Sequence, residues 1–425
     1  MRLSELRDLG RIDPDLEKGP VATLFLAAAF SFGPMALYAS GAMAGLLVVV
    51  TVLARMANSE RNPASGDGLP AVRNLALFVI GWSALSCTWA VDVEAAIFES
   101  AAALVSLVAA WLLLPTARAL RPAARSRLSR AYLVGIALLV MLGLGEQLLD
   151  MPLGNLSLVA DPTDNLLPAS ALLMLACWPA IALLVVIGAG RLKLIAVLSA
   201  VVLTLLVLGG GAILLMQLAA TALYAFARLG LRRIVLVGYL GISMMLMSAP
   251  WLLTEPALSA WVRSAAAPPF VSTADPALLP TLALVRSSPL QGYGAHALAR
   301  ARAEPTNRLD RMSSESVLTL SAGGLFLQLW LEQGIVGICL LLSWLAALLG
   351  ALLAADRRSP RSATRTHVLD AGLAGIGMFV LQAALLVDLT GVWWIAGLAI
   401  AGYFWLIAWS EAEDDNAPTR RTEGE

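Results

Sequence analysis

Residues 191–228 read RLKLIAVLSAVVLTLLVLGGGAILLMQLAATALYAFAR, and this stretch decides the class of fold. It contains two apolar runs, 192–208 and 211–227, which are separated by Gly209-Gly210-Gly211 and flanked by basic residues. A helix needs about twenty apolar residues to cross the hydrocarbon core of a bilayer, and each run approaches that length. The pattern therefore predicts two membrane-spanning helices that are split at the three glycines.

The rest of the chain repeats this pattern of long apolar runs. Of its 425 residues, 59% are hydrophobic and only 14% are charged, and the mean hydropathy is +0.80. A soluble domain usually has about a quarter charged residues. We therefore expect an all-α, polytopic transmembrane protein with about twelve spans. The expected spans are 20–38, 40–56, 74–91, 95–115, 130–149, 166–188, 192–208, 211–227, 233–253, 334–354, 368–387 and 391–409.

Arginine-rich connectors alternate along the chain with connectors that are bare or acidic. Basic short loops stay in the cytoplasm, so the alternation predicts a bacterial inner-membrane protein with both termini cytoplasmic. The basic connectors contain Arg55, Arg61 and Arg73; Arg118, Arg121, Arg125, Arg127 and Arg130; Arg191 and Lys193; Arg228, Arg232 and Arg233; and Arg357, Arg358, Arg361 and Arg365. The opposite connectors contain Asp92 and Glu94; Glu146, Asp150, Asp161 and Asp164; and Asp388.

This alternation divides the chain into five parts. They are a cytoplasmic tail (1–19), transmembrane helices one to nine (20–254), a large periplasmic loop (255–333), helices ten to twelve (334–410) and a second cytoplasmic tail (411–425). A connector as long as 255–333 is usually functional when it lies in a compact protein. We therefore expect the functional site to lie at the membrane boundary beneath this loop.

Several function classes are disfavoured by composition and motifs. The net charge is zero, so no electrostatic argument favours nucleic acid as a partner. The three cysteines, Cys87, Cys177 and Cys339, lie in separate apolar runs without metal-ligand spacing, so no metal site is expected. The chain contains no nucleotide-binding glycine loop, no zinc-protease motif and no hydrolase elbow. No cofactor is implied.

Five residues of the large loop are the candidates for chemistry. Arg286 and Arg300 suit a phosphate-bearing substrate because the planar guanidinium donates two parallel hydrogen bonds. His296 is a candidate general base near neutral pH. Gln328 and Glu332 are four residues apart, so they share one face of a helix among apolar neighbours. Polar residues at a membrane boundary are functional candidates. A solvated loop or a helix-end hydrogen bond is the structural alternative.

The region from Ser287 to Gly337 resembles the signature region of the O-antigen ligase and Wzy-type polysaccharide polymerase family. In that family a Pro-x-x-Gly-x-Gly turn lies in the large periplasmic loop. A Leu-Gln-x-x-x-Glu-x-Gly-x-x-Gly element then enters a membrane helix. The matching residues here are Pro289, Gly292 and Gly294 in the turn, and Leu327, Gln328, Glu332, Gly334 and Gly337 in the helix.

The resemblance implies a C-type glycosyltransferase of cell-surface polysaccharide assembly. Its substrate is a glycan linked to a polyprenyl pyrophosphate, and membrane lipids and other polysaccharide-assembly proteins are its expected partners. In this interpretation Arg286 and Arg300 bind the pyrophosphate, together with Gln328 as a substrate-binding residue. His296 or Glu332 receives the proton of the acceptor hydroxyl.

The chain also differs from the family pattern. Ser321-Ala322-Gly323-Gly324 replaces the family's His-Asn element, and Gly209-Gly210-Gly211 replaces a Ser-Arg-Gly element. These differences leave two other interpretations open. One is a non-catalytic scaffold or glycolipid-binding subunit of such a machine. The other is a transporter or flippase, which is expected to bury charges within its spans.

Overall fold

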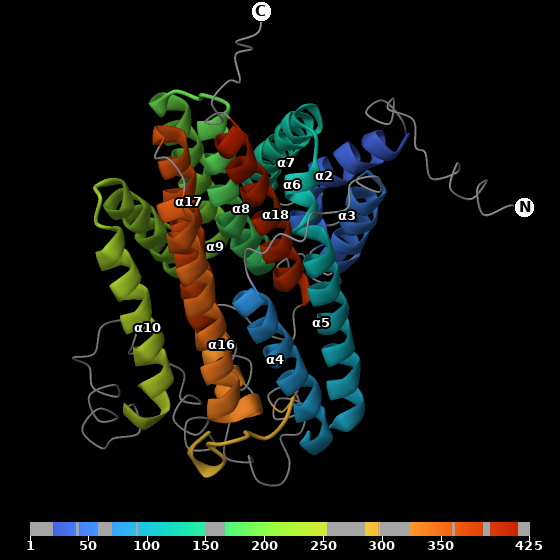
Figure 1. Cartoon of the computed structure of the whole chain (residues 1–425), viewed down its shortest axis with the longest axis vertical. Helices are drawn as coiled ribbons and strands as arrows, with labels where there is room; N and C mark the ends of the chain where they lie inside the picture. The colour runs from blue at the N-terminus through green and yellow to red at the C-terminus, as the bar shows by residue number, and fades with distance from the viewer. Residues whose placement is uncertain are drawn as a thin grey trace, which may run out of the picture.

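The computed structural model of the chain describes residues 20–39, 42–57, 70–90, 92–148, 166–252, 285–295, 297, 324–358, 362–385 and 392–414. These residues are helical almost throughout, and they include no strand (Figure 1). The predicted tail 1–19 and most of the predicted loop 255–333 lie outside the described residues. Within the predicted loop, the described residues are 285–295, 297 and 324–333.

Seven helices of the described part are long and apolar enough to cross a membrane, and four shorter apolar helices accompany them. This confirms the all-α, membrane-type fold. Each expected span overlaps one of the observed helices or one half of α9. The helices are α2 (Pro20–Tyr38), α3 (Met43–Ala57), α4 (Pro70–Ser86), η3 (Cys87–Trp89), α5 (Val93–Leu113), α6 (Thr116–Ala119), α7 (Pro122–Leu148), α8 (Leu166–Val186), α9 (Arg191–Arg228), α10 (Arg232–Leu252), α16 (Gly324–Arg358), α17 (Ala363–Leu385) and α18 (Val392–Asp414).

Helix α8 forms the centre of the bundle. Every residue from Ala169 to Leu183 is buried, as expected for a helix that is apolar on all sides. The hydroxyl of Tyr132 in α7 donates a hydrogen bond of 3.3 Å to the carbonyl of Ala176, and the amide of Gln382 in α17 donates one of 2.9 Å to the carbonyl of Ala171. Neighbouring helices are therefore joined to α8 both by apolar packing and by side-chain bonds to its backbone.

Helix α9 bends back on itself. It is 38 residues long, and a straight helix of that length would separate its ends by about 57 Å. However, Arg191 at its start and Arg228 at its end both act electrostatically on the same imidazole, that of His367. The two ends therefore lie at one end of the bundle. The sequence also predicted that the helix is interrupted at Gly209–Gly211. This prediction is wrong, because helical backbone continues through these residues.

Ion pairs join the basic connectors at the end of the bundle where α9 begins and ends. Asp370 near the start of α17 is fully buried and accepts from Arg232 at 2.7 Å and Arg228 at 3.5 Å. Further pairs join Arg365 to Glu413 at 3.3 Å and Arg125 to Asp414 at 2.9 Å. Connectors that are far apart in the sequence thus share one end of the bundle, uppermost in Figure 1.

Candidate functional site

The site begins with a kink in α16. At Gly334 the backbone adopts φ 63° and ψ −161°, a combination that only glycine adopts readily. The kink separates a short segment, Gly324–Gln333, from the long helix that follows. The expected tenth span starts at residue 334, so its predicted start coincides with the kink. From there to Arg358 the helix runs about 36 Å, so the site and the ion pairs of α17 lie at opposite ends of the bundle.

The turn 288–294 docks on this kink, and we call it the docked turn. The amide N–H of Tyr293 donates to the carbonyl of Leu331 at 2.7 Å, and that of Gly294 donates to the carbonyl of Glu332 at 2.9 Å. In the opposite direction, the amide of Ile335 donates to the carbonyl of Pro289 at 2.8 Å. The two elements that carry the family resemblance are therefore joined directly by main-chain hydrogen bonds.

Close backbone approach explains the glycines of the docked turn. Gly292 and Gly294 both have positive φ, at 68° and 88°. A Cβ on Gly292 would lie 2.6 Å from the carbonyl oxygen of Leu331, and one on Gly294 would lie 2.5 Å from the Cα of Ala90. The Pro-x-x-Gly-x-Gly pattern is thus the sequence of a turn that presses its backbone against two other segments.

Helix α4 holds the kink from the other side. The indole N–H of Trp82 donates to the carbonyl of Gln333 at 3.3 Å, and the amide of Gln333 donates to the hydroxyl of Ser83 at 2.9 Å. Trp82 also packs against Trp89, with ring centroids 5.5 Å apart. These contacts connect α4 to the residue that directly follows Glu332.

Two predicted site residues form a buried pair within the short segment. The side-chain amide of Gln328 donates to Oε1 of Glu332 at 3.1 Å, across one helical turn. Gln328 is 3% exposed and Glu332 is 4% exposed, so both polar side chains are almost fully removed from solvent. The shared helical face that the sequence predicts is therefore confirmed. Glu332 thus bonds to Gln328 within α16 through its side chain, and to Gly294 of the docked turn through its main-chain carbonyl.

Of the other three predicted site residues, only Arg286 is among the described residues. Arg286 lies two residues before the docked turn, and its side chain is exposed. His296 and Arg300, which the sequence suggested as base and phosphate ligand, lie outside the described residues. The structure thus brings Gln328 and Glu332 together, and it places Arg286 on the segment that leads into the turn bonded to Glu332.

Sequence reasoning missed the contribution of α4. Trp82, Ser83 and Gln333 had no assigned role, although Gln333 adjoins Glu332 in the quoted motif. The sequence did contain one signal, which is a glutamine, Gln333, in an otherwise apolar helix. A buried amide of this kind needs hydrogen-bond partners. Its partners lie about 250 residues away in the sequence, so no local pattern identifies them.

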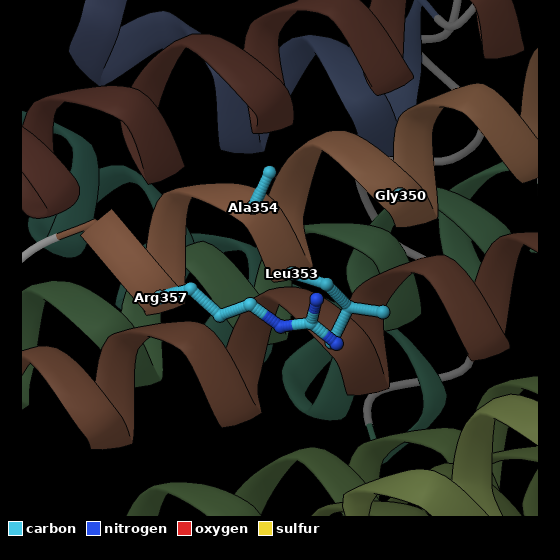
Figure 2. A pocket seen from close by; sticks show the side chains of 4 residues that line it. All are labelled: Gly350, Leu353, Ala354 and Arg357. Atoms are coloured by element: carbon cyan, nitrogen blue, oxygen red, sulfur yellow. The ribbon is translucent and has the colours of Figure 1, made fainter.

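A pocket of about 300 Å³ lies elsewhere, on the far half of α16 (Figure 2). Gly350, Leu353, Ala354 and Arg357 line it, and the guanidinium of Arg357 lies beside Leu353. This pocket is apolar and more than four helical turns from Gly334. It is therefore separate from the kink and from the docked turn.

Comparison with known proteins adds no further constraint on this site. No protein-family model matches the chain, and a search of curated proteins likewise finds no match.

Proposed function

We propose that this chain is a membrane-embedded glycan transferase, related in design to O-antigen ligases and Wzy-type polymerases. The observation that supports the proposal best is the hydrogen-bonded unit of the docked turn and the kinked helix. The two elements of the resemblance are joined by main-chain hydrogen bonds at Leu331 and Glu332, and the side chain of Glu332 is buried. The proposal places this unit at the periplasmic face of a bacterial inner membrane, because the opposite end carries the arginine-rich connectors.

In the proposed reaction the acceptor hydroxyl attacks the anomeric carbon of the donor glycan. The new C–O bond forms as the bond to the pyrophosphate oxygen breaks, and the polyprenyl pyrophosphate leaves with the bonding electrons. Glu332 accepts the proton of the acceptor hydroxyl as general base. Arg286, with its exposed guanidinium at the entrance to the docked turn, binds the departing pyrophosphate. His296 and Arg300 keep the roles of second base and second phosphate ligand in this proposal.

A non-catalytic scaffold is the second candidate. It is favoured by the nature of the docking contacts, which join backbone to backbone and need no reactive side chain. The replacement of the family's His-Asn element by Ser321-Ala322-Gly323-Gly324 points in the same direction. In this alternative, the buried pair of Gln328 and Glu332 supports the kink and takes no part in chemistry.

Gene deletion followed by complementation separates the two candidates. Both predict that deletion causes lipid-linked glycan units to accumulate in the membrane. If the chain is an enzyme, Glu332→Gln protein at normal levels fails to clear the accumulated lipid, because the amide cannot accept the proton. If it is a scaffold, the same variant clears it as wild type does. Deletion without any change in surface glycan or lipid-linked intermediates would reject both candidates.

A further inference from the structure

The pocket on the far half of α16 opens on the surface of the bundle. The four residues that line it are three or four positions apart, so they share one face of the helix (Figure 2). From Ala346 to Arg357, no residue whose side chain the structure describes is buried. In a membrane-embedded chain, an uncovered apolar face of this kind lies against lipid. We call this pocket the α16 groove.

The length of α16 places the groove at the edge of the hydrocarbon core. With Gly334 at one boundary of a core about 30 Å thick, Leu353 lies about 29 Å along the helix and Arg357 lies about 35 Å along it. Leu353 is therefore at the level where the acyl chains begin, and Arg357 is at the level of the lipid headgroups. The two levels match the two parts of a phospholipid.

Arg357 is directed toward the groove. Helical side chains lean toward the N-terminal end of their helix, and the side chain of Arg357 runs back along α16 until its guanidinium lies beside Leu353 (Figure 2). Within the described residues, Arg357 forms no ion pair with an acidic side chain. The connector 356–365 contains four arginines and one aspartate, so this region is positively charged. An anion from outside the chain is the partner that fits this charge.

We infer that the α16 groove binds one anionic phospholipid. The guanidinium of Arg357 donates two parallel hydrogen bonds to the phosphate, and the first part of one acyl chain lies against Leu353 and Ala354. A volume of about 300 Å³ is at the small end for ligand pockets, which suits part of a single chain. Such binding is independent of glycan transfer, because the groove is separate from the kink and the docked turn. The alternative is that Arg357 only complements the partial negative charge at the C-terminal end of its helix.

The test measures phospholipid binding to the full-length protein in detergent by native mass spectrometry. Phosphatidylglycerol is compared with phosphatidylcholine of the same acyl chains, because only phosphatidylglycerol has a net negative charge. We expect wild type to bind the first phosphatidylglycerol about ten-fold more tightly than the first phosphatidylcholine, and Arg357→Gln to lose this preference. Leu353→Trp fills the groove without changing the charge, and it should also lower the affinity for phosphatidylglycerol about ten-fold. If Leu353→Trp does not fold, Ala354→Met fills the same groove.

Arg55→Gln is the matched control. Arg55 is also an exposed arginine in the last turn of an apolar helix, α3, but it does not line the groove. We expect this variant to keep the wild-type affinity for phosphatidylglycerol. Equal losses in Arg55→Gln and Arg357→Gln overturn the inference, as does an unchanged affinity in Arg357→Gln or in the variant that fills the groove. Equal binding of the two lipids by wild type also overturns it. If Arg357→Gln keeps its affinity but unfolds at a lower temperature in lipid-free detergent, Arg357 has the helix-end role alone.

Discussion

The amide nitrogen of Gly294 lies 2.9 Å from the carbonyl oxygen of Glu332, and this hydrogen bond joins the docked turn to the kinked helix α16. It connects the backbone of the docked turn to the residue with the buried carboxylate. Any movement of the turn therefore acts on Glu332 directly.

Replacement of Gly334 by alanine tests the kink. The added Cβ meets the carbonyl of Leu290, and the backbone conformation of Gly334 is strained for any residue with a side chain. We expect Gly334→Ala to lower the free energy of unfolding by about 1–3 kcal/mol and to abolish most glycan output. Thermal unfolding in detergent and analysis of surface glycans measure the two effects.

Gly350→Ala is the matched control in the same helix. A Cβ on Gly350 meets no atom within 4 Å, so the change relieves the low helix propensity of glycine without a clash. We expect unchanged glycan output and a stability equal to wild type or higher by up to about 1 kcal/mol. Equal behaviour of the two variants would show that the kink has no special role.

Substitution of Arg286 tests pyrophosphate binding. If the guanidinium donates two hydrogen bonds to the leaving group, Arg286→Ala loses a charge-assisted interaction of about 1.5–3 kcal/mol, and transfer falls roughly ten- to a hundred-fold. Arg286→Lys should lose much of the same activity, because an ammonium is a point charge without the fork. The measurement is the transfer rate in liposomes at saturating acceptor.

The same assay applies to His296, whose side chain lies outside the described residues. We expect His296→Ala to reduce transfer while donor binding is retained, if the histidine is a second base. Normal glycan length and amount in the Arg286→Ala, His296→Ala double variant, present at normal levels, would favour the scaffold interpretation.

Asp370 tests the ion pairs that join α9 and α10 to α17. Its carboxylate is fully buried, while the side chains of Arg228 and Arg232 are 34% and 19% exposed. We expect Asp370→Asn to lower stability by about 3 kcal/mol, at the low end for a buried pair because the arginines retain some solvent. A double-mutant cycle with Arg232→Gln measures the coupling. Additive effects of the two changes would contradict a direct pair.

Cysteine labelling tests the arrangement of the two ends. In a background lacking Cys87, Cys177 and Cys339, we expect Leu192→Cys and Leu229→Cys to react with a membrane-impermeant reagent only after the cells are opened. These positions are 82% and 73% exposed and lie at the two ends of α9. Leu290→Cys, at a position that is 70% exposed in the docked turn, should react from outside. Labelling of Leu192→Cys and Leu229→Cys from opposite sides would show that α9 crosses the membrane once.

The sequence by itself determined the helical fold of the described residues, the positions of the apolar helices and the start of the long helix at Gly334. These features are local, because a segment in a bilayer must satisfy its backbone hydrogen bonds within itself, and its hydropathy shows where it lies. The periodicity of one helix also placed Gln328 and Glu332 on a common face.

Only the tertiary structure decided the docking of the turn on the kink and the contribution of α4. The docking bonds join main-chain groups, which every residue carries, so no side-chain pattern specifies which carbonyl accepts from Gly294. Similarly, the partners of Gln333 and Asp370 are brought near by the path of the backbone and lie far away in the sequence. The burial of Glu332 follows from this packing, because a carboxylate loses contact with solvent only when segments from elsewhere in the chain cover it.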